Sequence, residues 1–249
     1  MALSGDGNTA LVGGFEDGAN DTGAAWVFTR SGSVWGQQGS KLVGAEAGGT
    51  TAFLGYSVAL SGDGNTAIVG GPDYGDLAGA AWVFTRSGGV WTQQGSKLVG
   101  TGVSVGDAQQ GYSVALSGDG NTAIIGGLGD NIDSGAAWVF TRSGGVWTQQ
   151  GHKLVGTGAT EEARQGCSVA LSGDGNTAIV GGPGDNSGAG AVWPFVAGPT
   201  LPPIPAITSV LNAASFAGST VSPGSWVSIF GTSLAPAGDS RTWNPTTEM

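Results

Sequence analysis

The string Leu3-Ser-Gly-Asp-Gly-Asn-Thr-Ala10 occurs four times in this chain and decides its fold. Its serine recurs at Ser4, Ser61, Ser117 and Ser172, so successive copies lie 57, 56 and 55 residues apart. Self-similarity over such a period is typical of solenoids, arrays and propellers. The number of strands within one period distinguishes these folds, and a β-solenoid usually has shorter coils than this.

The second copy predicts four strands. Gly55–Leu60 alternates large apolar residues with small ones, and Thr66–Val69 is a short apolar run typical of a strand buried on both faces. Between them, Asp63-Gly64 can adopt the positive φ angles of a tight hairpin. Ala80–Arg86 predicts a third strand and Val90–Gln94 a fourth. With no helical periodicity, the sequence predicts an all-β fold, a β-propeller of four-stranded blades of about 55–57 residues.

The same copy carries a family resemblance. It contains Gly-Tyr-Ser-Val-Ala-Leu, Gly-Gly-Pro, Gly-Ala-Ala-Trp-Val-Phe-Thr-Arg-Ser-Gly, Trp-Thr-Gln-Gln and Lys-Leu-Val in that order. This pattern recurs over roughly Met1 to Val196 and resembles the FG-GAP repeat, which forms the propeller of integrin α-chains and of many bacterial secreted proteins. The resemblance implies a bacterial, extracellular scaffold for adhesion or ligand binding, without identifying the ligand.

The predicted domain organisation has three parts. Residues 1–196 form the FG-GAP-like blades, residues 197–206 a proline-rich linker, and residues 207–249 the start of an immunoglobulin-like module. This last part is too short for a complete sandwich of roughly 100 residues, so we expect a partial β-sandwich-like segment.

The two end copies of the repeat are incomplete. The first lacks the Gly-Tyr-Ser-Val that opens the others, and the fourth runs through Trp193–Val196 into the linker without a fourth strand. We therefore expect a piece of a larger propeller, with further sequence and a signal peptide upstream of Met1. Pro194 leaves an alternative open, because proline suits an edge strand and thus a last blade of three strands.

Composition excludes several classes of partner. The formal net charge is −10, with no basic run, so nucleic acid and anionic membranes are poor partners. No apolar stretch is long enough for a membrane helix, and the single cysteine cannot form an intrachain disulfide. We expect an extracellular or cell-surface protein that binds a protein or a glycan and self-associates if the propeller is incomplete.

Calcium is not predicted at the repeated hairpin. The calcium loop of the FG-GAP family runs Asp-x-Asn-x-Asp-Gly-x-x-Asp, whereas Ala59 and Ala67 replace its first and last acids here. The remaining carboxylates are interpreted as turn residues that bond their own backbone, at Asp6, Asp63, Asp119 and Asp174. No metal site and no cofactor is expected.

Two sets of residues are candidate binding positions. Carboxylates recur in the loops after the second strands, at Asp17, Asp21, Asp73, Asp76, Asp130, Asp133 and Asp185. Tryptophans follow the glycine-rich turn before the fourth strands, at Trp35, Trp91 and Trp147, where they could stack on sugar rings. The alternatives are solvated loops for the acids and packing for the tryptophans. Packing between blades is the prediction for Trp26, Trp82, Trp138 and Trp193.

No catalytic constellation is evident, and we predict that the chain is not an enzyme. His152 replaces a serine of the other copies and is predicted at the surface, while Cys167 replaces Tyr56 and Tyr112 and is predicted to be buried. The recurring Arg and Lys residues are predicted to make repeated structural contacts, with carboxylates of neighbouring blades among their expected partners. The alternatives are a lectin or glycan-active enzyme fragment, or a purely structural spacer.

Overall fold

A computed structural model describes residues 1–47, 51–75, 77–104, 107–160 and 162–198, together with the backbone of two later strands. Its contacts divide the chain into two units, Met1–Ala197 and Gly198–Met249. The first unit holds all four repeats.

The second repeat forms one antiparallel sheet of four strands. These are β5 (Ser57–Leu60), β6 (Thr66–Gly71), β7 (Ala80–Ser87) and β8 (Val90–Gln93), and they pair in chain order. Turn residues separate the strands, and all six residues of β6 are buried. The four predicted strands are therefore confirmed.

The other repeats form equivalent sheets. Blade 1 contains β1 (Ala2–Leu3), β2 (Thr9–Gly14), β3 (Ala24–Ser31) and β4 (Val34–Gln37). Blade 3 contains β9 (Ser113–Leu116), β10 (Thr122–Gly127), β11 (Ala136–Ser143) and β12 (Val146–Gln149). Blade 4 contains only β13 (Ser168–Leu171), β14 (Thr177–Gly182) and β15 (Ala191–Val196) within the described residues, as expected from the incomplete fourth copy.

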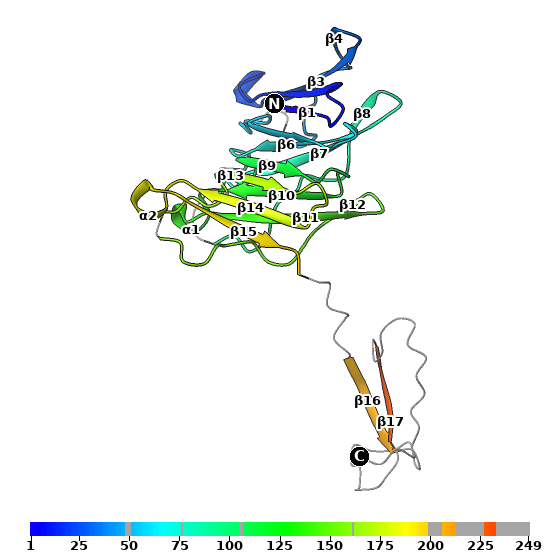
Figure 1. Ribbon diagram of the computed structural model, residues 1–249, viewed down its shortest axis with the longest axis vertical. Helices are drawn as coiled ribbons and strands as arrows, with labels where there is room; N and C mark the ends of the chain where they lie inside the picture. Colours follow the sequence, from blue (N-terminus) through cyan, green and yellow to red (C-terminus); the bar gives the residue numbers. More distant parts are fainter. Residues whose placement is uncertain are drawn as a thin grey trace. The chain divides into compact units, whose positions relative to one another are not determined.

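Short helical turns follow three of the second strands. They are η1 (Ala19–Asp21), α1 (Asp130–Asp133) and α2 (Asp185–Gly188), each a single turn with residues at positive φ. Figure 1 shows α1 and α2 on the same side of the first unit. The acidic loops of successive blades therefore share one side, as the repeat predicts.

The blades succeed one another through the unit in chain order, from blade 1 to blade 4 (Figure 1). The first strands β1, β5, β9 and β13 contact one another in sequence. At their hairpins a chain of backbone hydrogen bonds joins the blades, because the amide of Gly5 donates to Gly62, Gly62 to Gly118, and Gly118 to Gly173, each at 2.8 Å. The fold is the predicted array of β-propeller blades.

Each blade presents one face to the preceding blade and the other to the following blade; we call these the back face and the front face. In blade 2 the back face carries Val69, Trp82 and Phe84, which are buried against blade 1. The front face carries Ile68 and Val83, which are buried against blade 3. Packing between blades therefore forms the core, and the prediction for Trp82 and Trp138, both fully buried, is confirmed.

Glycines at the end of the second strands allow this close packing. A Cβ at Gly126 would lie 2.1 Å from the carbonyl oxygen of Gly166 in the connection to the following blade. The hydroxyl of Ser113 donates to that same oxygen at 2.7 Å. The backbones of neighbouring blades thus touch where the sequence has Gly-Gly.

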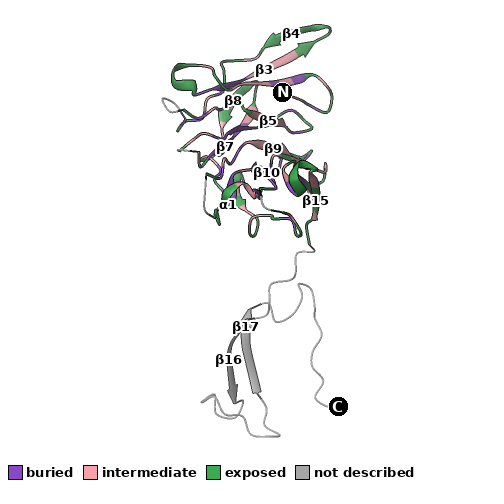
Figure 2. Ribbon diagram, turned by 90° about the vertical axis from the view of Figure 1, so that its left-hand side faces the viewer, coloured by how far each residue is buried: buried purple, intermediate pink, exposed green. Residues whose placement is uncertain are grey.

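Side chains are less buried in blades 1 and 4, the two end blades of the array. Figure 2 shows β4 of blade 1 exposed along its length, and Trp26 and Trp193 are only half-buried, unlike Trp82 and Trp138. Blades 1 and 4 each pack against one neighbour within the described residues.

The second unit is described only by the antiparallel pair β16 (Ala206–Asn212) and β17 (Val227–Thr232). Most of the predicted linker, residues 197–206, and most of the predicted immunoglobulin-like segment, residues 207–249, lie outside the described residues. Both assignments stay predictions.

Candidate functional site

The hairpin carboxylates act as turn residues, as predicted. Asp63 accepts hydrogen bonds from the backbone amide of Asn65 at 2.9 Å and from the hydroxyl of Ser61 at 2.5 Å. The same bonds recur in the other copies, and in blade 1 the Ser4 hydroxyl and then Asn8 lower the pKa of Asp6 to about 2. Within the described ranges no group of three His, Cys, Asp or Glu side chains is placed to hold a metal ion.

Two of the acidic loop residues are structural braces in the later blades. Asp130 is fully buried; it accepts from the backbone amide of Ser104 at 2.7 Å and pairs with Lys153. Asp185 is also buried and accepts from the amide and the hydroxyl of Thr160, at 2.7 and 2.9 Å. Each carboxylate thereby holds the segment that leads from the preceding blade into its own blade.

The other loop acids lie nearer the solvent. Asp17 pairs with Lys41, and Asp133 lies 4.0 Å from Arg164. Asp21 is exposed, and burial raises the pKa of Asp73. Asp76 lies outside the described residues. Ligand binding by the loop acids stays a prediction.

A row of aromatic side chains crosses blades 1 to 3 close to the acidic loops. The ring of Tyr56 lies 5.5 Å from that of Phe15 and 4.9 Å from that of Tyr112. Its hydrogen bond with Tyr112, together with burial, raises the pKa of Tyr56 to about 12. Tyr56 is nevertheless 39% exposed. The sequence signal for this row is the Gly-Tyr-Ser that recurs at Tyr56 and Tyr112.

The buried role predicted for Cys167 is wrong. Cys167 is half-buried because it lies just before β13 rather than within the strand, as Tyr56 and Tyr112 lie just before β5 and β9. Burial raises the pKa of its thiol, so the neutral form is favoured. His152 is exposed, as predicted.

The tryptophans of the fourth strands belong to a polar network that joins consecutive blades. Arg142 of blade 3 donates to Gln94 at 3.0 Å and to Thr66 at 3.3 Å, both in blade 2, and to Asn121 in its own blade. The indole of Trp147 donates to the same Gln94 oxygen at 3.1 Å, and the guanidinium carbon of Arg142 lies 5.3 Å from the centre of the Trp147 ring. The side-chain oxygen of Gln94 thus accepts hydrogen bonds from both Arg142 and Trp147.

The same network joins blades 1 and 2. Arg86 donates to Gln38, Thr9 and Asn65, and Trp91 donates to Gln38. The predicted structural contacts of the arginines are confirmed, but their hydrogen-bond partners are amides and hydroxyls. Carboxylates instead pair with the lysines, in the pairs Lys41–Asp17, Lys97–Glu46 and Lys153–Asp130.

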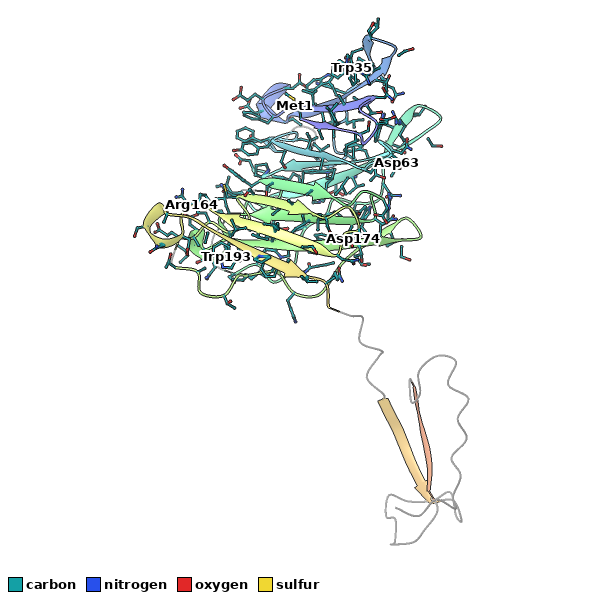
Figure 3. All side chains as sticks on the ribbon, in the orientation of Figure 1. Met1, Trp35, Asp63, Arg164, Asp174 and Trp193 are labelled. Atoms are coloured by element: carbon teal, nitrogen blue, oxygen red, sulfur yellow. The ribbon has the colours of Figure 1, made fainter. Side chains whose placement is uncertain are left out.

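In blade 1 the network is incomplete. Arg30 bonds only Asn8 among the described residues, and Trp35 is 42% exposed at the outer hairpin (Figure 3). Figure 3 also shows Asp63 and Asp174 on one side of the unit and Arg164, next to the acidic loops, on the opposite side. Trp35 is the tryptophan most available for the predicted stacking on a sugar, which stays a prediction.

Replacing Arg142 by alanine is expected to lower the free energy of unfolding by about 1–3 kcal/mol, because it leaves the side-chain oxygens of Thr66 and Asn121 without their donor and Gln94 with that of Trp147 alone. Chemical denaturation of the full chain, followed by circular dichroism, measures this change. Arg30→Ala is the matched control, since Arg30 makes no bond to another blade, and its expected effect is within about 0.5 kcal/mol. Equal losses in both variants would contradict the network's role.

No helix within the described part of the chain is both long and apolar enough to cross a membrane.

Comparison with known proteins returned structural likenesses only: no protein-family model and no curated protein matches the chain. Among solved structures, TolB from Acinetobacter baumannii aligns with a TM-score of 0.45 and 13% identity over 79% of this chain and 40% of that one. A putative TolB from Agrobacterium tumefaciens aligns with a TM-score of 0.46 and 15% identity over 78% and 56%. Hydrazine synthase from Kuenenia stuttgartiensis aligns with 0.46 and 14% over 78% and 44%.

This chain therefore spans between 40% and 56% of the length of these three proteins. None of these three structural likenesses assigns a function to this chain, and the FG-GAP resemblance stays a prediction.

Proposed function

We propose that this chain is a non-catalytic scaffold, displayed at the cell surface or secreted, that binds a protein partner through the end faces of its blade array. The observation that supports this proposal is the front face of blade 4. Ile179 is 45% exposed and Val192 is 63% exposed, whereas their equivalents in blade 3, Ile124 and Ala137, are fully buried against the next blade. Apolar positions that the repeat normally covers are open here.

These apolar residues are neighbours on one sheet face. Ile179 pairs across the sheet with Pro194, and Ala170 pairs with Ile179. Val192 and Val196 lie two residues to either side of Pro194 and point to the same face. All five are exposed, and a contiguous apolar surface of this kind is typical of a protein interaction site.

We propose a second copy of the chain as the partner. The back face of blade 1 carries Trp26 and Phe28, the equivalents of the Trp and Phe that cover the front face of the preceding blade at each internal junction. Both are half-exposed in blade 1. The open back face of one copy thus matches the open front face of another, and association would be head to tail.

Light scattering of the full chain over a range of concentrations tests this proposal. We expect a mass that rises with concentration, and we expect Val192→Glu to shift the chain to the monomer, because it places a charge in an apolar interface. Val146→Glu is the matched control: Val146 is also 63% exposed but lies in the outer strand β12. A wild-type monomer at every concentration, or assembly unchanged by Val192→Glu, would refute the proposal.

A further inference from the structure

The junction between blades 3 and 4 lacks the arginine that links the other blades. Ala197 occupies the position of Arg142, and its amide donates to the carbonyl of Asn176 at 2.8 Å, as that of Arg142 donates to Asn121 at 2.8 Å. The backbone therefore follows the course that it takes in blade 3. The guanidinium is missing, and within the described residues blade 4 also has no counterpart of the fourth strand that carries the tryptophan.

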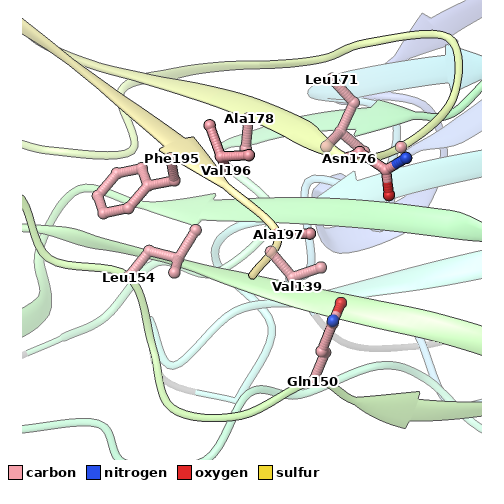
Figure 4. A pocket seen from close by; sticks show the side chains of 10 residues that line it. Val139, Gln150, Leu154, Leu171, Asn176, Ala178, Phe195, Val196 and Ala197 are labelled. Carbon is pink, nitrogen blue, oxygen red and sulfur yellow. The ribbon is translucent and has the colours of Figure 1, made fainter. Parts of the chain in front are cut away.

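A pocket of about 160 Å³ lies at this place (Figure 4). Its lining includes Gln150 and Asn176, the equivalents of two of the hydrogen-bond partners of Arg142, and Figure 4 shows their amides toward one side and Phe195 and Leu154 toward the other. Gln150 is exposed, whereas Gln94, which holds Arg142 and Trp147, is half-buried. The pocket thus combines an apolar wall with a polar end.

The hydrogen-bond acceptors of the network are present but unused. At the junction of blades 2 and 3, Gln94, Thr66 and Asn121 accept from Arg142. Their equivalents at the last junction are Gln150, Thr122 and Asn176, whose side-chain oxygens accept no hydrogen bond from any residue in the described ranges. Three separate acceptors suit the five N–H donors of a guanidinium group better than they suit the compact ammonium group of lysine. The arrangement therefore favours arginine over lysine as the ligand.

The charge around the pocket also favours a cation. Burial lowers the pKa of the Arg142 guanidinium, and the carboxylates of Asp119 and Asp63 act against this change. The equivalents of these two carboxylates at the last junction are Asp174 and Asp119. The hydroxyl of Ser172 and the amides of Asn176 lower the pKa of Asp174, and equivalent contacts lower that of Asp119, so both carboxylates are charged at neutral pH.

We propose that this pocket binds an arginine side chain of a partner polypeptide whose backbone pairs with the open edge of β15. In blade 3 the corresponding edge of β11 pairs with β12, with Arg142 opposite Trp147 and Phe140 opposite Gln149. Strand β15 has no such neighbour within the described residues. Strand addition supplies backbone hydrogen bonds and the guanidinium supplies specificity. The pocket shares Val196 with the front face of blade 4, but this inference does not depend on the proposed self-association.

The test uses the full chain and a synthetic peptide with the sequence of residues 144–149 and arginine at the position of Trp147, Gly-Gly-Val-Arg-Thr-Gln, so that the arginine lies opposite Ala197 as Trp147 lies opposite Arg142. Binding of the peptide to the full chain is measured by isothermal titration calorimetry. A peptide with lysine in place of the arginine is expected to bind about 10-fold more weakly or worse, from the loss of charge-assisted hydrogen bonds worth about 1.5–3 kcal/mol.

Two protein variants complete the test. Ala197→Arg is expected to fill the pocket from within, raising the melting temperature and weakening peptide binding about 10-fold or more, and Gln150→Ala is expected to weaken binding by a similar factor. His152→Ala, which changes an exposed residue outside the pocket, is the control that keeps wild-type binding. The inference is overturned if the wild type does not bind the peptide, if the lysine peptide binds equally well, or if Ala197→Arg leaves binding intact. None of these results would count for or against the proposed self-association of the chain.

Discussion

Replacing Trp138 by alanine is expected to lower the free energy of unfolding by about 3–5 kcal/mol, because it opens a large cavity between blades 2 and 3. The Trp138 side chain is fully buried and packs with Ala81, Val83 and Leu98 of the preceding blade and the connection that follows it. Its indole donates to the carbonyl of Thr101 at 2.8 Å, and that acceptor would lose its partner. Urea denaturation of the full chain, followed by far-ultraviolet circular dichroism, measures the loss.

Trp193→Ala provides the matched control for this prediction. Trp193 has the same place in blade 4 and donates to the carbonyl of Thr157 at 3.1 Å, but it is only half-buried. Its loss is expected to cost less than half as much, since less apolar surface is removed from the core. If both variants lost the same free energy, burial between blades would not be the main source of the tryptophan's contribution.

Replacing Gly126 by alanine is expected to lower the free energy of unfolding by about 3 kcal/mol or more, an overpacking effect at the upper end of its usual range. The new Cβ would lie 2.1 Å from the carbonyl oxygen of Gly166, far inside van der Waals contact. Neither atom can rotate away, because the Cβ is fixed by the backbone of residue 126 and the oxygen belongs to the backbone of Gly166. The blades would have to separate, and the bond from Ser113 to the same oxygen would be lost with them.

Gly181→Ala separates this effect from the intrinsic cost of changing a strand glycine. Gly181 is the equivalent position in blade 4, and the nearest atom to its new Cβ is the side-chain oxygen of Ser168 at 2.3 Å. A hydroxyl can turn to another rotamer, so the expected loss is about 1 kcal/mol or less. The comparison uses the same denaturation measurement. A loss in Gly126→Ala no larger than in Gly181→Ala would show that close approach of the blades is not limiting.

The strands could be predicted from the sequence because their signals are local. Turn chemistry such as Ser61–Asn65 marks the hairpin, and the alternation in Ala80–Arg86 assigns Trp82 and Phe84 to one face. The recurrence of these signals at one spacing then gives the blade. Each of these inferences needs only residues that are close together in the chain.

The polar contacts could not be predicted with the same success, because they depend on how one blade is placed on the next. Arg142 reaches Gln94, 48 residues earlier in the chain, and no pattern within one repeat identifies an amide rather than a carboxylate as its partner. Likewise, the repeat assigns Asp130 to a loop, yet that carboxylate is buried by a connection whose course is set by tertiary packing.

The pocket at Ala197 illustrates what a repeat adds to sequence reasoning. Neither Ala197 nor Gln150 is notable alone, and a single copy offers no reason to connect them. Comparison with Arg142 and Gln94 identifies the missing side chain, and the matching backbone hydrogen bonds show that its surroundings are retained.

The hydrogen bonds from Gly5 to Gly62, Gly62 to Gly118 and Gly118 to Gly173 have an evolutionary consequence. Because every junction uses the same donor, acceptor and flanking glycines, removal or duplication of one whole repeat by unequal recombination would join surfaces that already fit. Such an event would leave the remaining junctions unchanged, since each blade contacts only its neighbours. Lineages that carry this gene are therefore expected to differ in the number of repeats more readily than in the sequence at the junctions.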